Sequence, residues 1–476
     1  MKDKLLNYLK SSIALNWLHY YRYDSTSETK HNYSSLLYWR TQKKLAQIQG
    51  ISAQNPYNLT VFVVEENPIE FISAFLASVI AEVQVFLCNP AWQQREWQQV
   101  LNLVKPDLVF GDATVSKAIQ IDPHIAIATV DTDSGLIMIP TGGTSGKIKF
   151  AIHDWSTLTA SVTGFQQFFE CQAINSWCTL PLYHVSGLMQ LMRSLVTQGN
   201  LVLCPYKLTS PEIDRDRSTY FISLVPTQLQ FLIDFNPDWL RKFKTVLVGG
   251  APARRSLLDR AREAKIAIAL IYGSTETASG VVALKPEEFW AGNTSDGKAL
   301  PHAQIWLELI LIQAVESKGD RPIGSITIRS TSNFKGYYPR FTNDGLLTAD
   351  DCGYRDSQGY IHLVGRDSHK IITGGENVFP REVEAAIYDT NLVDAVCVVG
   401  IPDRQWGQAV TAVYVPSIFT SDSSSIEQRI QSQLAKYKQP KNWIKVDYLP
   451  RHDNDKIDYQ RLKAIAIEKV LNNKNN

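Results

Sequence analysis

Residues 136–149 read LIMIPTGGTSGKIK, and they carry the clearest structural signal in the chain. The apolar part, Leu136–Pro140, predicts a buried strand that ends in a loop of glycine, threonine and serine. Glycines let the backbone approach an oxyanion closely, hydroxyl groups donate hydrogen bonds, and Lys147 and Lys149 add positive charge. Because α/β folds bind ligands at the carboxyl ends of strands, the segment indicates such a fold with a nucleotide-phosphate site.

This loop differs from the Walker A phosphate loop. The Walker A pattern G-x-x-x-x-G-K-[ST] requires a glycine five residues before Gly146, where this chain has Thr141, and a hydroxyl residue where it has Ile148. A P-loop kinase or NTPase is therefore disfavoured. Judged by the loop alone, a surface loop without any ligand remains an equally good interpretation.

Strand-like and helix-like segments alternate on both sides of the loop. Apolar runs predict strands at Thr60–Val64, Val85–Leu87, Leu108–Phe110, Ile125–Val130, Leu201–Cys204, Phe221–Val225 and Thr245–Val248. The intervening segments predict helices at Phe71–Val83, Trp92–Val104 and Ser256–Glu263. This alternation predicts parallel sheets covered by helices on both faces. Two later runs, Ile305–Ile312 and Ile323–Arg329, alternate in polarity and predict a more antiparallel sheet.

The character of the chain changes at the polar segment Arg366–Lys370. We expect a large N-terminal α/β domain with parallel-rich sheets over residues 1–366, and a small C-terminal α+β domain over residues 367–476, joined by a hinge. The expected elements of the small domain are a helix opened by Pro380, strands at Ala395–Ile401 and Ala409–Val415, a helix at Ile426–Ala435 and a strand at Trp443–Leu449.

Composition excludes several classes of protein. The 476 residues hold 48 Lys and Arg against 47 Asp and Glu, so nucleic acid is not a favoured partner. The six cysteines form no CxxC pair, and we expect neither disulfides nor structural zinc. The most apolar segment, Ile69–Cys88, contains Glu70 and Glu82, which argues against membrane insertion. The N-terminus lacks a signal-peptide pattern, so we expect a cytoplasmic protein.

The loop resembles the phosphate-binding loop of the adenylate-forming superfamily, which includes acyl-CoA ligases, luciferases and peptide-synthetase adenylation domains. That loop reads approximately [ST]-S-G-T-[TS]-G-x-P-K-G, so Lys149 falls on its lysine, while Ile148 replaces its proline and Phe150 its last glycine. The resemblance implies that the loop binds ATP and that Thr144 is also catalytic. The implied ATP-binding residues are Thr141, Gly142, Gly143, Thr144, Ser145, Gly146, Lys147 and Lys149.

Further segments resemble the superfamily in the same order along the chain, from about residue 55 to residue 465. In Pro181–Gly187, the resemblance places His184 and Ser186 at the acyl and adenylate pocket, with His184 among the catalytic residues. It places Gly249, Gly250, Ala251 and Tyr272 around the adenine and Thr275 on phosphate, and it adds Gly273 and Ser274 to the ATP-binding residues. It makes Glu276 a catalytic residue and the ligand of Mg²⁺, a hard cation that prefers oxygen donors.

The resemblance continues into the last third of the chain. Asp351 in ADDCGY falls on the aspartate that binds the ribose hydroxyls, and Arg366 on an arginine near ribose and phosphate. Ser368 falls on the hinge. Gly374, Gly375 and Glu376 match the loop that meets the pantetheine of CoA, and Lys456 falls on the catalytic lysine, with Asp455 in place of the usual glycine.

The implied reaction is attack of a carboxylate on the α-phosphorus of ATP, followed by transfer of the acyl group to CoA. Catalysis of the first step depends on positioning and on electrostatic stabilisation. The resemblance implies that the small domain rotates about Ser368 between the two steps, which withdraws Lys456 and brings in the loop at Gly374–Glu376.

Within the superfamily, the segments around His153 and His184, followed by Arg193, resemble ligases that activate 2-succinylbenzoate in quinone biosynthesis. That acid has two carboxylates, and Arg193 could pair with the one that is not activated; the ordinary alternative is an exposed helix arginine. We retain two other functions, another aryl- or medium-chain acyl-CoA ligase and a ligase-like binding protein that has lost its chemistry. A homo-oligomer stays open.

Overall fold

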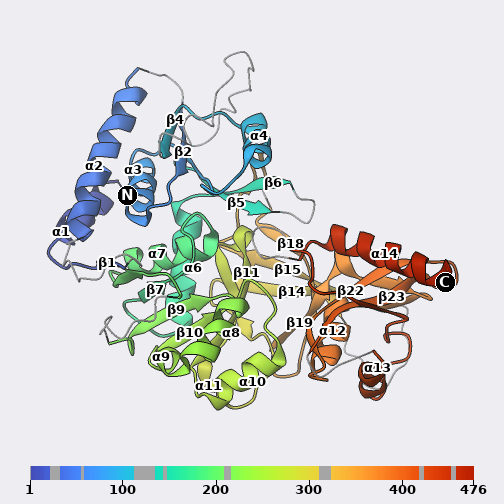
Figure 1. The fold of residues 1–476 in the computed structure, drawn as a ribbon. Helices are drawn as coiled ribbons and strands as arrows, with labels where there is room; N and C mark the ends of the chain where they lie inside the picture. The colour runs from blue at the N-terminus through green and yellow to red at the C-terminus, as the bar shows by residue number, and fades with distance from the viewer. Residues whose placement is uncertain are drawn as a thin grey trace. The chain divides into compact units, whose positions relative to one another are not determined.

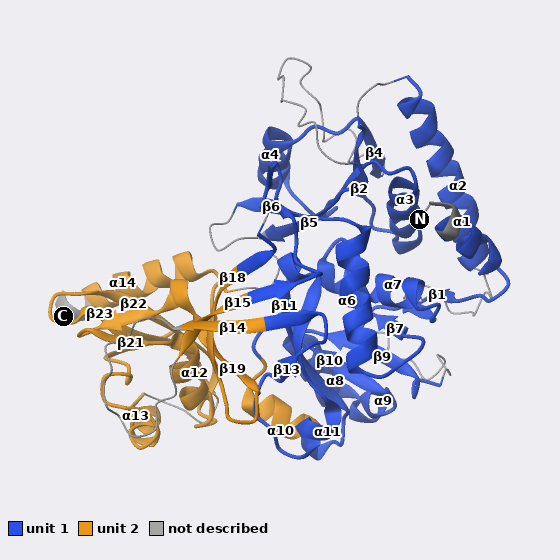
Figure 2. Ribbon diagram, turned by 180° about the vertical axis from the view of Figure 1, so that it is seen from behind, with its two compact units in different colours: residues 1–252, 262–304, 328–347 blue, residues 253–261, 305–327, 348–476 orange. Residues whose placement is uncertain are grey.

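The computed structural model describes residues 2–21, 33–54, 58–111, 134–142, 147–207, 216–309, 323–342, 344–417, 423–451 and 457–475. The chain divides into two compact units (Figure 2). Unit 1 consists of Met1–Pro252, Arg262–Gln304 and Ile328–Leu347, and unit 2 of Ala253–Ala261, Ile305–Thr327 and Thr348–Asn476. The expected division at residues 366 and 367 stays a prediction.

Unit 1 contains a seven-stranded sheet that carries the glycine-rich loop, and Figure 1 labels its strands β2, β4, β5 and β6. The strand order is β17-β16-β6-β5-β3-β2-β4. Four strands are mutually parallel: β2 (Thr60–Val64), β3 (Gln84–Leu87), β4 (Leu108–Gly111) and β5 (Ile137–Gly142). Three more are antiparallel: β6 (Ile148–His153), β16 (Gly336–Tyr337) and β17 (Arg340–Phe341). The loop therefore joins the hairpin β5–β6; the expected strand at Ile125–Val130 lies outside the described residues.

The second sheet of unit 1 has eight strands in the order β1-β8-β7-β9-β10-β11-β12-β13. Six are parallel: β1 (Leu18–Tyr20), β7 (Asn175–Cys178), β8 (Leu201–Leu203), β9 (Tyr220–Leu224), β10 (Thr245–Val248) and β11 (Ile268–Ser274). Two antiparallel strands follow, β12 (Ser279–Leu284) and β13 (Lys298–Ala299). The strands β8, β9 and β10 are mostly apolar and buried, as strands covered on both faces should be, whereas β11 is less buried toward its carboxyl end.

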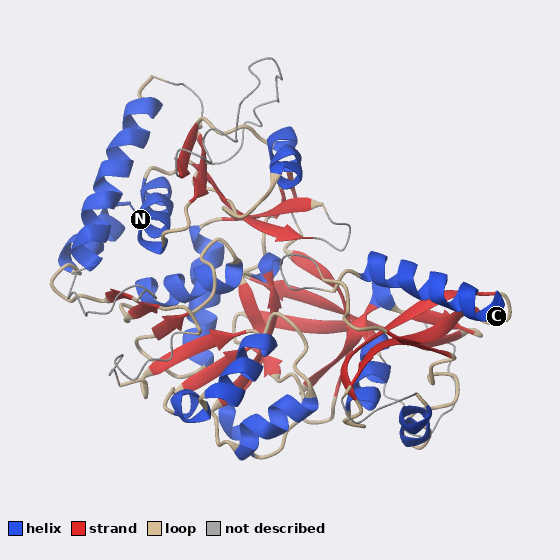
Figure 3. Cartoon of the chain, viewed as in Figure 1, coloured by secondary structure: helices blue, strands red, loops and turns tan. Residues whose placement is uncertain are grey.

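Helices accompany both sheets of unit 1 (Figure 3). They are α1 (Lys2–Ser11), α2 (Tyr33–Ser52), α3 (Pro68–Ile80), α4 (Gln94–Leu103), α6 (Trp155–Phe168), α7 (Val185–Val196), α8 (Pro226–Phe235), α9 (Pro237–Arg241) and α11 (Pro286–Trp290). One large apolar cluster joins the helices α2, α3, α6 and α7 to the strands of both sheets. This cluster is the main core of unit 1.

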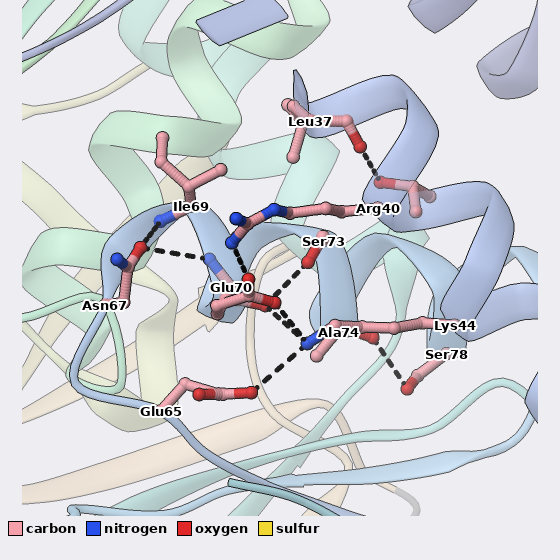
Figure 4. A network of polar contacts seen from close by, with 11 residues as sticks. Leu37, Arg40, Lys44, Glu65, Asn67, Ile69, Glu70, Ser73, Ala74 and Ser78 are labelled. Atoms are coloured by element: carbon pink, nitrogen blue, oxygen red, sulfur yellow. Dashed lines mark hydrogen bonds and ion pairs between the residues drawn. The ribbon is translucent and has the colours of Figure 1, made fainter. Parts of the chain in front are cut away.

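A polar network fixes α2 against the start of α3 (Figure 4). Lys44 on α2 lies 3.1 Å from the Glu65 carboxylate and 2.8 Å from that of Glu70, and Arg40 also pairs with Glu70. Burial lowers the pKa of Lys44, but the neighbouring Glu65 carboxylate opposes that shift. Asn67 caps α3 by accepting hydrogen bonds from the first-turn amides. These partly buried charges are compensated within the fold, and we assign them a structural role.

Unit 2 holds most of a four-stranded sheet and all of a five-stranded one. The first consists of β14 (Ala303–Leu309), β15 (Gly324–Ser330), β18 (Leu346–Arg355) and β19 (Ile361–Arg366), and β18 and β19 pair antiparallel. The second consists of β20 (Ile371–Thr373), β21 (Glu376–Val378), β22 (Val393–Asp403), β23 (Gly407–Pro416) and β24 (Asn442–Lys445). The helices are α10 (Arg255–Glu263), which begins in this unit, α12 (Pro380–Tyr388), α13 (Ser424–Ile430) and α14 (Tyr459–Asn475).

The α/β class with parallel-rich sheets is confirmed, as is the α+β character of the C-terminal part. The apolar segment from Ile69 to Cys88 forms a buried helix and a strand, as expected. Among the described residues, no helix is long and apolar enough to cross a membrane. All six cysteines are unpaired.

Candidate active site

Three of the segments selected from the sequence lie at one edge of the eight-stranded sheet. The parallel strands β7 and β10 end at this edge at Cys178 and Val248, and β11, in which Leu270 pairs with Val248, continues to Ser274. The segments 181–187 and 249–251 follow these strand ends, and the segment 272–277 begins with the last three residues of β11. The carboxyl edge of a parallel sheet is where α/β folds bind their ligands, so the candidate site of unit 1 lies here.

Glycines allow these segments to pack closely at this edge. A Cβ atom on Gly249 would lie 2.6 Å from the Ile271 carbonyl oxygen, and one on Gly273 would lie 1.9 Å from that of Ser279. Gly250 has a φ of +78°, a backbone conformation that side chains rarely adopt. Larger residues at Gly249 and Gly273 would therefore push apart the segments that we expect to surround the adenine.

The short 3-10 helix η1 (Thr275–Thr277) carries the expected phosphate and metal ligands, and it is held from several sides. The Thr277 hydroxyl contacts the Ser274 amide at 2.9 Å and donates to the Ser279 carbonyl at 2.7 Å. The Ser332 hydroxyl donates to the Thr277 carbonyl, and the next residue, Ala278, has a left-handed φ of 49°. The loop is thus preorganised, as an electrostatic catalytic site requires.

Glu276 has a partner that the sequence analysis did not identify. The Tyr337 hydroxyl donates a hydrogen bond of 2.6 Å to Glu276 Oε1, and Lys149 Nζ lies 4.9 Å from the centre of the same Tyr337 ring. Burial, together with the Glu276 carboxylate, raises the pKa of Tyr337, so the phenol remains a donor at neutral pH. Tyr337 therefore joins the expected metal ligand to the expected phosphate-binding lysine.

His153 is a second positioning residue next to η1. Its ring is fully buried, with Nε2 2.8 Å from the Thr275 carbonyl and Nδ1 3.0 Å from the Thr157 hydroxyl. Burial lowers the pKa of His153 to about 4, so the ring is neutral at pH 7. Because a carbonyl can only accept, Nε2 carries the proton and Nδ1 accepts from Thr157. The neutral ring thus holds the backbone immediately before Glu276.

The hairpin β5–β6 explains both departures in the glycine-rich loop. Residues 143–146, which include Gly143, Thr144, Ser145 and Gly146, lie outside the described residues. The Ile148 amide donates to Gln99 Oε1 at 3.1 Å, a bond that a proline could not make. Phe150 is fully buried, and its ring centre lies 5.0 Å from that of Phe86. Ile148 therefore keeps an amide that bonds to Gln99, and Phe150 fills the apolar core beneath the hairpin.

The same hairpin places the remaining loop residues. Thr141 pairs with Lys149 across the two strands, and Gly142 with Ile148. Lys147 and Lys149 are both exposed, which leaves their charges available to a ligand. The strand β5 also packs against η1, so the start of the loop is close to Thr275 and Glu276.

The expected acyl-site residues lie on α7. His184 is the residue that precedes α7, and its ring centre lies 4.6 Å from that of Tyr183. Ser186, Gln190 and Arg193 follow at intervals of four and three residues, which places them on one face of the helix. The Gln190 amide nitrogen donates to the Ser186 carbonyl at 3.0 Å. Arg193 therefore lies two turns further along the face that begins at Ser186.

Arg193 is not an exposed helix arginine. Only 4% of it is exposed, its guanidinium lies 4.0 Å from the centre of the Phe165 ring, and Nη2 donates to the Ser279 hydroxyl at 3.2 Å. Its Nε is buried without a hydrogen-bond partner among the described residues, none of which forms an ion pair with it. Burial lowers the pKa of Arg193 to about 10, so the group is still charged at pH 7.

Unit 2 carries the expected ribose and hinge residues on β18, β19 and η2 (Asp367–His369). Arg366 Nε lies 3.5 Å from the Asp351 carboxylate, across the pair of strands β18 and β19. The neighbouring Asp350 is engaged differently, since it accepts hydrogen bonds from the Ser368 amide at 3.0 Å and the Ser368 hydroxyl at 2.5 Å. Asp350 is thus bound to the expected hinge residue, and the assignment of Asp351 to the ribose stays a prediction.

The loop expected to meet pantetheine is a tight turn between β20 and β21. Gly374 and Gly375 have φ values of 60° and 86°, as two-residue hairpin turns require. The Gly374 amide donates to the Trp406 carbonyl at 2.8 Å, and a Cβ on Gly374 would meet that indole at 2.9 Å. Glu376 is the first residue of β21. Lys456 lies outside the described residues.

The site chemistry fits Mg²⁺ bound together with a nucleotide. Among the described residues, no group of three or more His, Cys, Asp or Glu side chains could hold a metal ion. Mg²⁺ often binds through one or two carboxylates plus substrate phosphates, and Glu276 offers such a carboxylate. Its Oε1 is bound to Tyr337, and Oε2 has no hydrogen-bond partner among the described residues.

Comparison with known protein families agrees with this geometry. The family model described as AMP-binding enzyme matches residues 49–338, and the model of the AMP-binding enzyme C-terminal domain matches residues 382–456. The chain belongs to the AMP-binding enzyme family. The match covers all the site segments of unit 1, and the second match contains the expected catalytic Lys456.

Two curated members of the AMP-binding enzyme family are similar to this chain over most of its length. A 2-succinylbenzoate–CoA ligase of Enterococcus faecalis is 34% identical over 353 residues, which cover 72% of each chain. An indoleacetate–CoA ligase of Aromatoleum aromaticum is 28% identical over 372 residues, covering 74% of this chain and 71% of the relative.

Among solved structures, o-succinylbenzoate CoA synthetase of Bacillus subtilis, in complex with its acyl-adenylate intermediate, has a TM-score of 0.80. It is 24% identical to this chain, and the match covers 96% of this chain and 98% of the other. This likeness confirms the expected fold of a large α/β domain and a small C-terminal domain.

Proposed function

We propose that this AMP-binding enzyme is a 2-succinylbenzoate–CoA ligase. It would convert ATP, 2-succinylbenzoate and CoA into 2-succinylbenzoyl-CoA, AMP and pyrophosphate, in the biosynthesis of menaquinone or phylloquinone. The choice of acid depends on Arg193, a buried cation on the helix face that begins at Ser186, which has no anionic partner among the described residues. The identity of the E. faecalis relative supports the same choice.

The first half-reaction needs no protein nucleophile. A carboxylate oxygen of the acid attacks the α-phosphorus of ATP, the bond from that phosphorus to the bridging oxygen breaks, and pyrophosphate leaves. The glycine-rich loop from Thr141 to Lys149 would bind the phosphates, with Lys149 placed by Tyr337. Gly249–Ala251 and Tyr272 would surround the adenine. Positioning and fixed positive charge are the main catalytic contributions of such a site.

Mg²⁺ would neutralise charge on the phosphate oxygens when it is bound. Glu276 would hold it, and Tyr337 and His153 would keep that carboxylate and its backbone in place. In unit 2, Asp351 would accept hydrogen bonds from the ribose hydroxyls, with Arg366 beside it. Lys456 would stabilise the charge that develops during adenylation.

The second half-reaction joins the acyl group to CoA. The thiol sulfur attacks the acyl carbon of the adenylate, the bond from that carbon to the AMP oxygen breaks, and AMP leaves with that oxygen. The turn at Gly374 and Gly375, followed by Glu376, would contact the pantetheine, and Ser368 would be the hinge that separates the two steps. We place the enzyme in the cytoplasm, where ATP and CoA are available.

A second candidate is a ligase for another aryl or medium-chain acid, and the A. aromaticum relative favours that class. Arg193 distinguishes the two candidates. An acid with a single carboxylate uses that group in adenylation, so no anionic group is left to pair with the buried guanidinium. A ligase-like protein without activity is disfavoured by the intact Glu276–Tyr337–Lys149 arrangement.

The test is pyrophosphate release with ATP, Mg²⁺ and CoA, comparing 2-succinylbenzoate with benzoate, coumarate and octanoate. The proposal requires the highest kcat/KM for 2-succinylbenzoate, and a loss of that preference in Arg193→Met. Preference for an acid with one carboxylate would keep the ligase and reject the proposed acid. Absence of turnover with every acid would favour the inactive binding protein.

A further inference from the structure

Two buried side chains of unit 1, His302 and Arg193, adjoin the same helix, α6, and each has nitrogen atoms without a hydrogen-bond partner among the described residues. Both ring nitrogens of His302 are buried, and neither has a hydrogen-bond partner among the described residues. The same is true of Arg193 Nε. Such groups are uncommon in folded proteins, because each costs the free energy of removing it from water without a replacement bond.

The two groups pack against consecutive residues of α6, Gly164 and Phe165. A Cβ on Gly164 would lie 1.8 Å from His302 Nδ1, so the imidazole ring rests directly on the Gly164 backbone. The Arg193 guanidinium lies 4.0 Å from the ring centre of Phe165, the next residue. The two groups also interact electrostatically: burial lowers the pKa of His302 to about 4, and the positive charge of Arg193 contributes to that shift.

Nothing among the described residues balances the charge at this place. The titratable group that affects the pKa of Arg193 is the Cys171 thiol, and burial raises the pKa of that thiol, so it is neutral at pH 7. Ser279 supplies a hydroxyl, which has no charge. A buried cation without a counter-ion is costly, and a bound anion would remove that cost.

We propose that His302, together with Arg193 and Ser279, forms a subsite that binds the second carboxylate of the acyl substrate. This inference rests on the proposed function, and it adds a specificity-determining residue to it. One carboxylate oxygen would accept from Arg193 and the other from the ring N–H of His302. These bonds would satisfy donors of Arg193 and His302 that have no hydrogen-bond partner among the described residues.

A purely structural role explains His302 less well. A histidine that only filled space would be replaceable by an apolar ring, and buried imidazoles normally bond through at least one nitrogen, as His153 does. Gly164 also has no side chain at the one place where a methyl group would displace the ring. The glycine at position 164 therefore leaves room for the His302 imidazole against α6.

The experiment compares His302→Phe with His302→Asn and His302→Gln, which place an amide near Nδ1 and Nε2 respectively. Each variant is assayed for kcat/KM with 2-succinylbenzoate and with its analogue in which the carboxylate that is not activated is a primary amide. His302→Phe should lose about ten- to a hundredfold with the dicarboxylate, the effect of one charge-assisted hydrogen bond. It should change the monoamide by less than about threefold, and one of the two amide variants should recover most of the loss.

Two results would overturn the inference. Equal losses with both acids would show that His302 supports the fold only, and unchanged kinetics with both would show that it does not contact the substrate. Failure of the proposed function gives a different result, namely no turnover of 2-succinylbenzoate by the unaltered enzyme. In that case, the same His302 variants are assayed with the acid of the panel that has the highest kcat/KM. If that acid has no second anionic group, the proposed carboxylate subsite is also rejected.

Discussion

Replacing Tyr337 with phenylalanine removes one hydroxyl from the centre of the candidate site. That hydroxyl donates to Glu276 Oε1 at 2.6 Å, and the ring beneath Lys149 stays in place. The freed carboxylate can then rotate, so it is no longer held in the geometry that a metal ligand needs. We therefore expect weaker binding of the metal–nucleotide complex and a slower adenylation step.

The size of the effect follows from the bond that is lost. A hydrogen bond to a charged group contributes about 1.5–3 kcal/mol, and groups that orient a metal ligand change metal affinity by about ten- to a hundredfold. Tyr337→Phe should accordingly raise the Mg²⁺ concentration needed for half-maximal pyrophosphate release by about tenfold. Titration of Mn²⁺ in the presence of ATP, followed by electron paramagnetic resonance, measures the same affinity without turnover.

Tyr338→Phe is the matched control, since it removes a neighbouring phenol whose ring packs on Phe86 and has no contact with Glu276 among the described residues. It should leave the metal titration unchanged. If Tyr337→Phe lowers kcat but leaves both metal titrations at the unaltered values, the phenol does not position Glu276, and the reasoning is refuted.

Other substitutions test separate parts of the account. Lys456→Ala should slow adenylation by more than about a hundredfold but leave thioester formation from preformed adenylate nearly intact, and equal loss of both steps would contradict that division. Gly273→Ala places a methyl group 1.9 Å from the Ser279 carbonyl, so unit 1 should lose more than about 2 kcal/mol of stability in urea unfolding. Burial raises the pKa of Glu384 from 4.5 to about 7, so its carboxyl group costs stability as pH rises through that interval. Glu384→Gln should then stabilise unit 2 at pH 8 relative to pH 5 by up to about 3 kcal/mol, as measured by hydrogen exchange; an equal effect at both pH values would reject the assignment.

The parallel sheets could be predicted from the sequence because their strands are short, apolar runs separated by amphipathic helices. The strand Thr60–Val64 is an example, since its bounds agree with β2. The helix α2 was not predicted. Its buried face includes Ser34 and Thr41, and these small polar residues interrupt the apolar periodicity that identifies a helix. The strand expected at Trp443–Leu449 is shorter in the structure, where β24 ends at Lys445.

The local motifs of the candidate site were accessible to sequence reasoning, but its long-range contacts were not. Tyr337 lies 61 residues from Glu276 in the chain, and His302 meets Gly164 through tertiary packing alone. The burial of Arg193 also depends on Phe165 and Ser279, which are distant in sequence. A residue that acts by positioning another has no signature of its own in a single sequence, so these contacts required the structure.

An isotope experiment follows the carboxylate oxygen of the acid through both half-reactions. The enzyme is incubated with ATP, Mg²⁺, CoA and 2-succinylbenzoate labelled with ¹⁸O in its carboxylates. The masses of AMP and of the acyl-CoA product are then measured by mass spectrometry. Adenylation followed by thioester formation transfers one labelled oxygen to AMP and yields 2-succinylbenzoyl-CoA. A thioester formed with unlabelled AMP, or the absence of any thioester from this acid, would contradict the account.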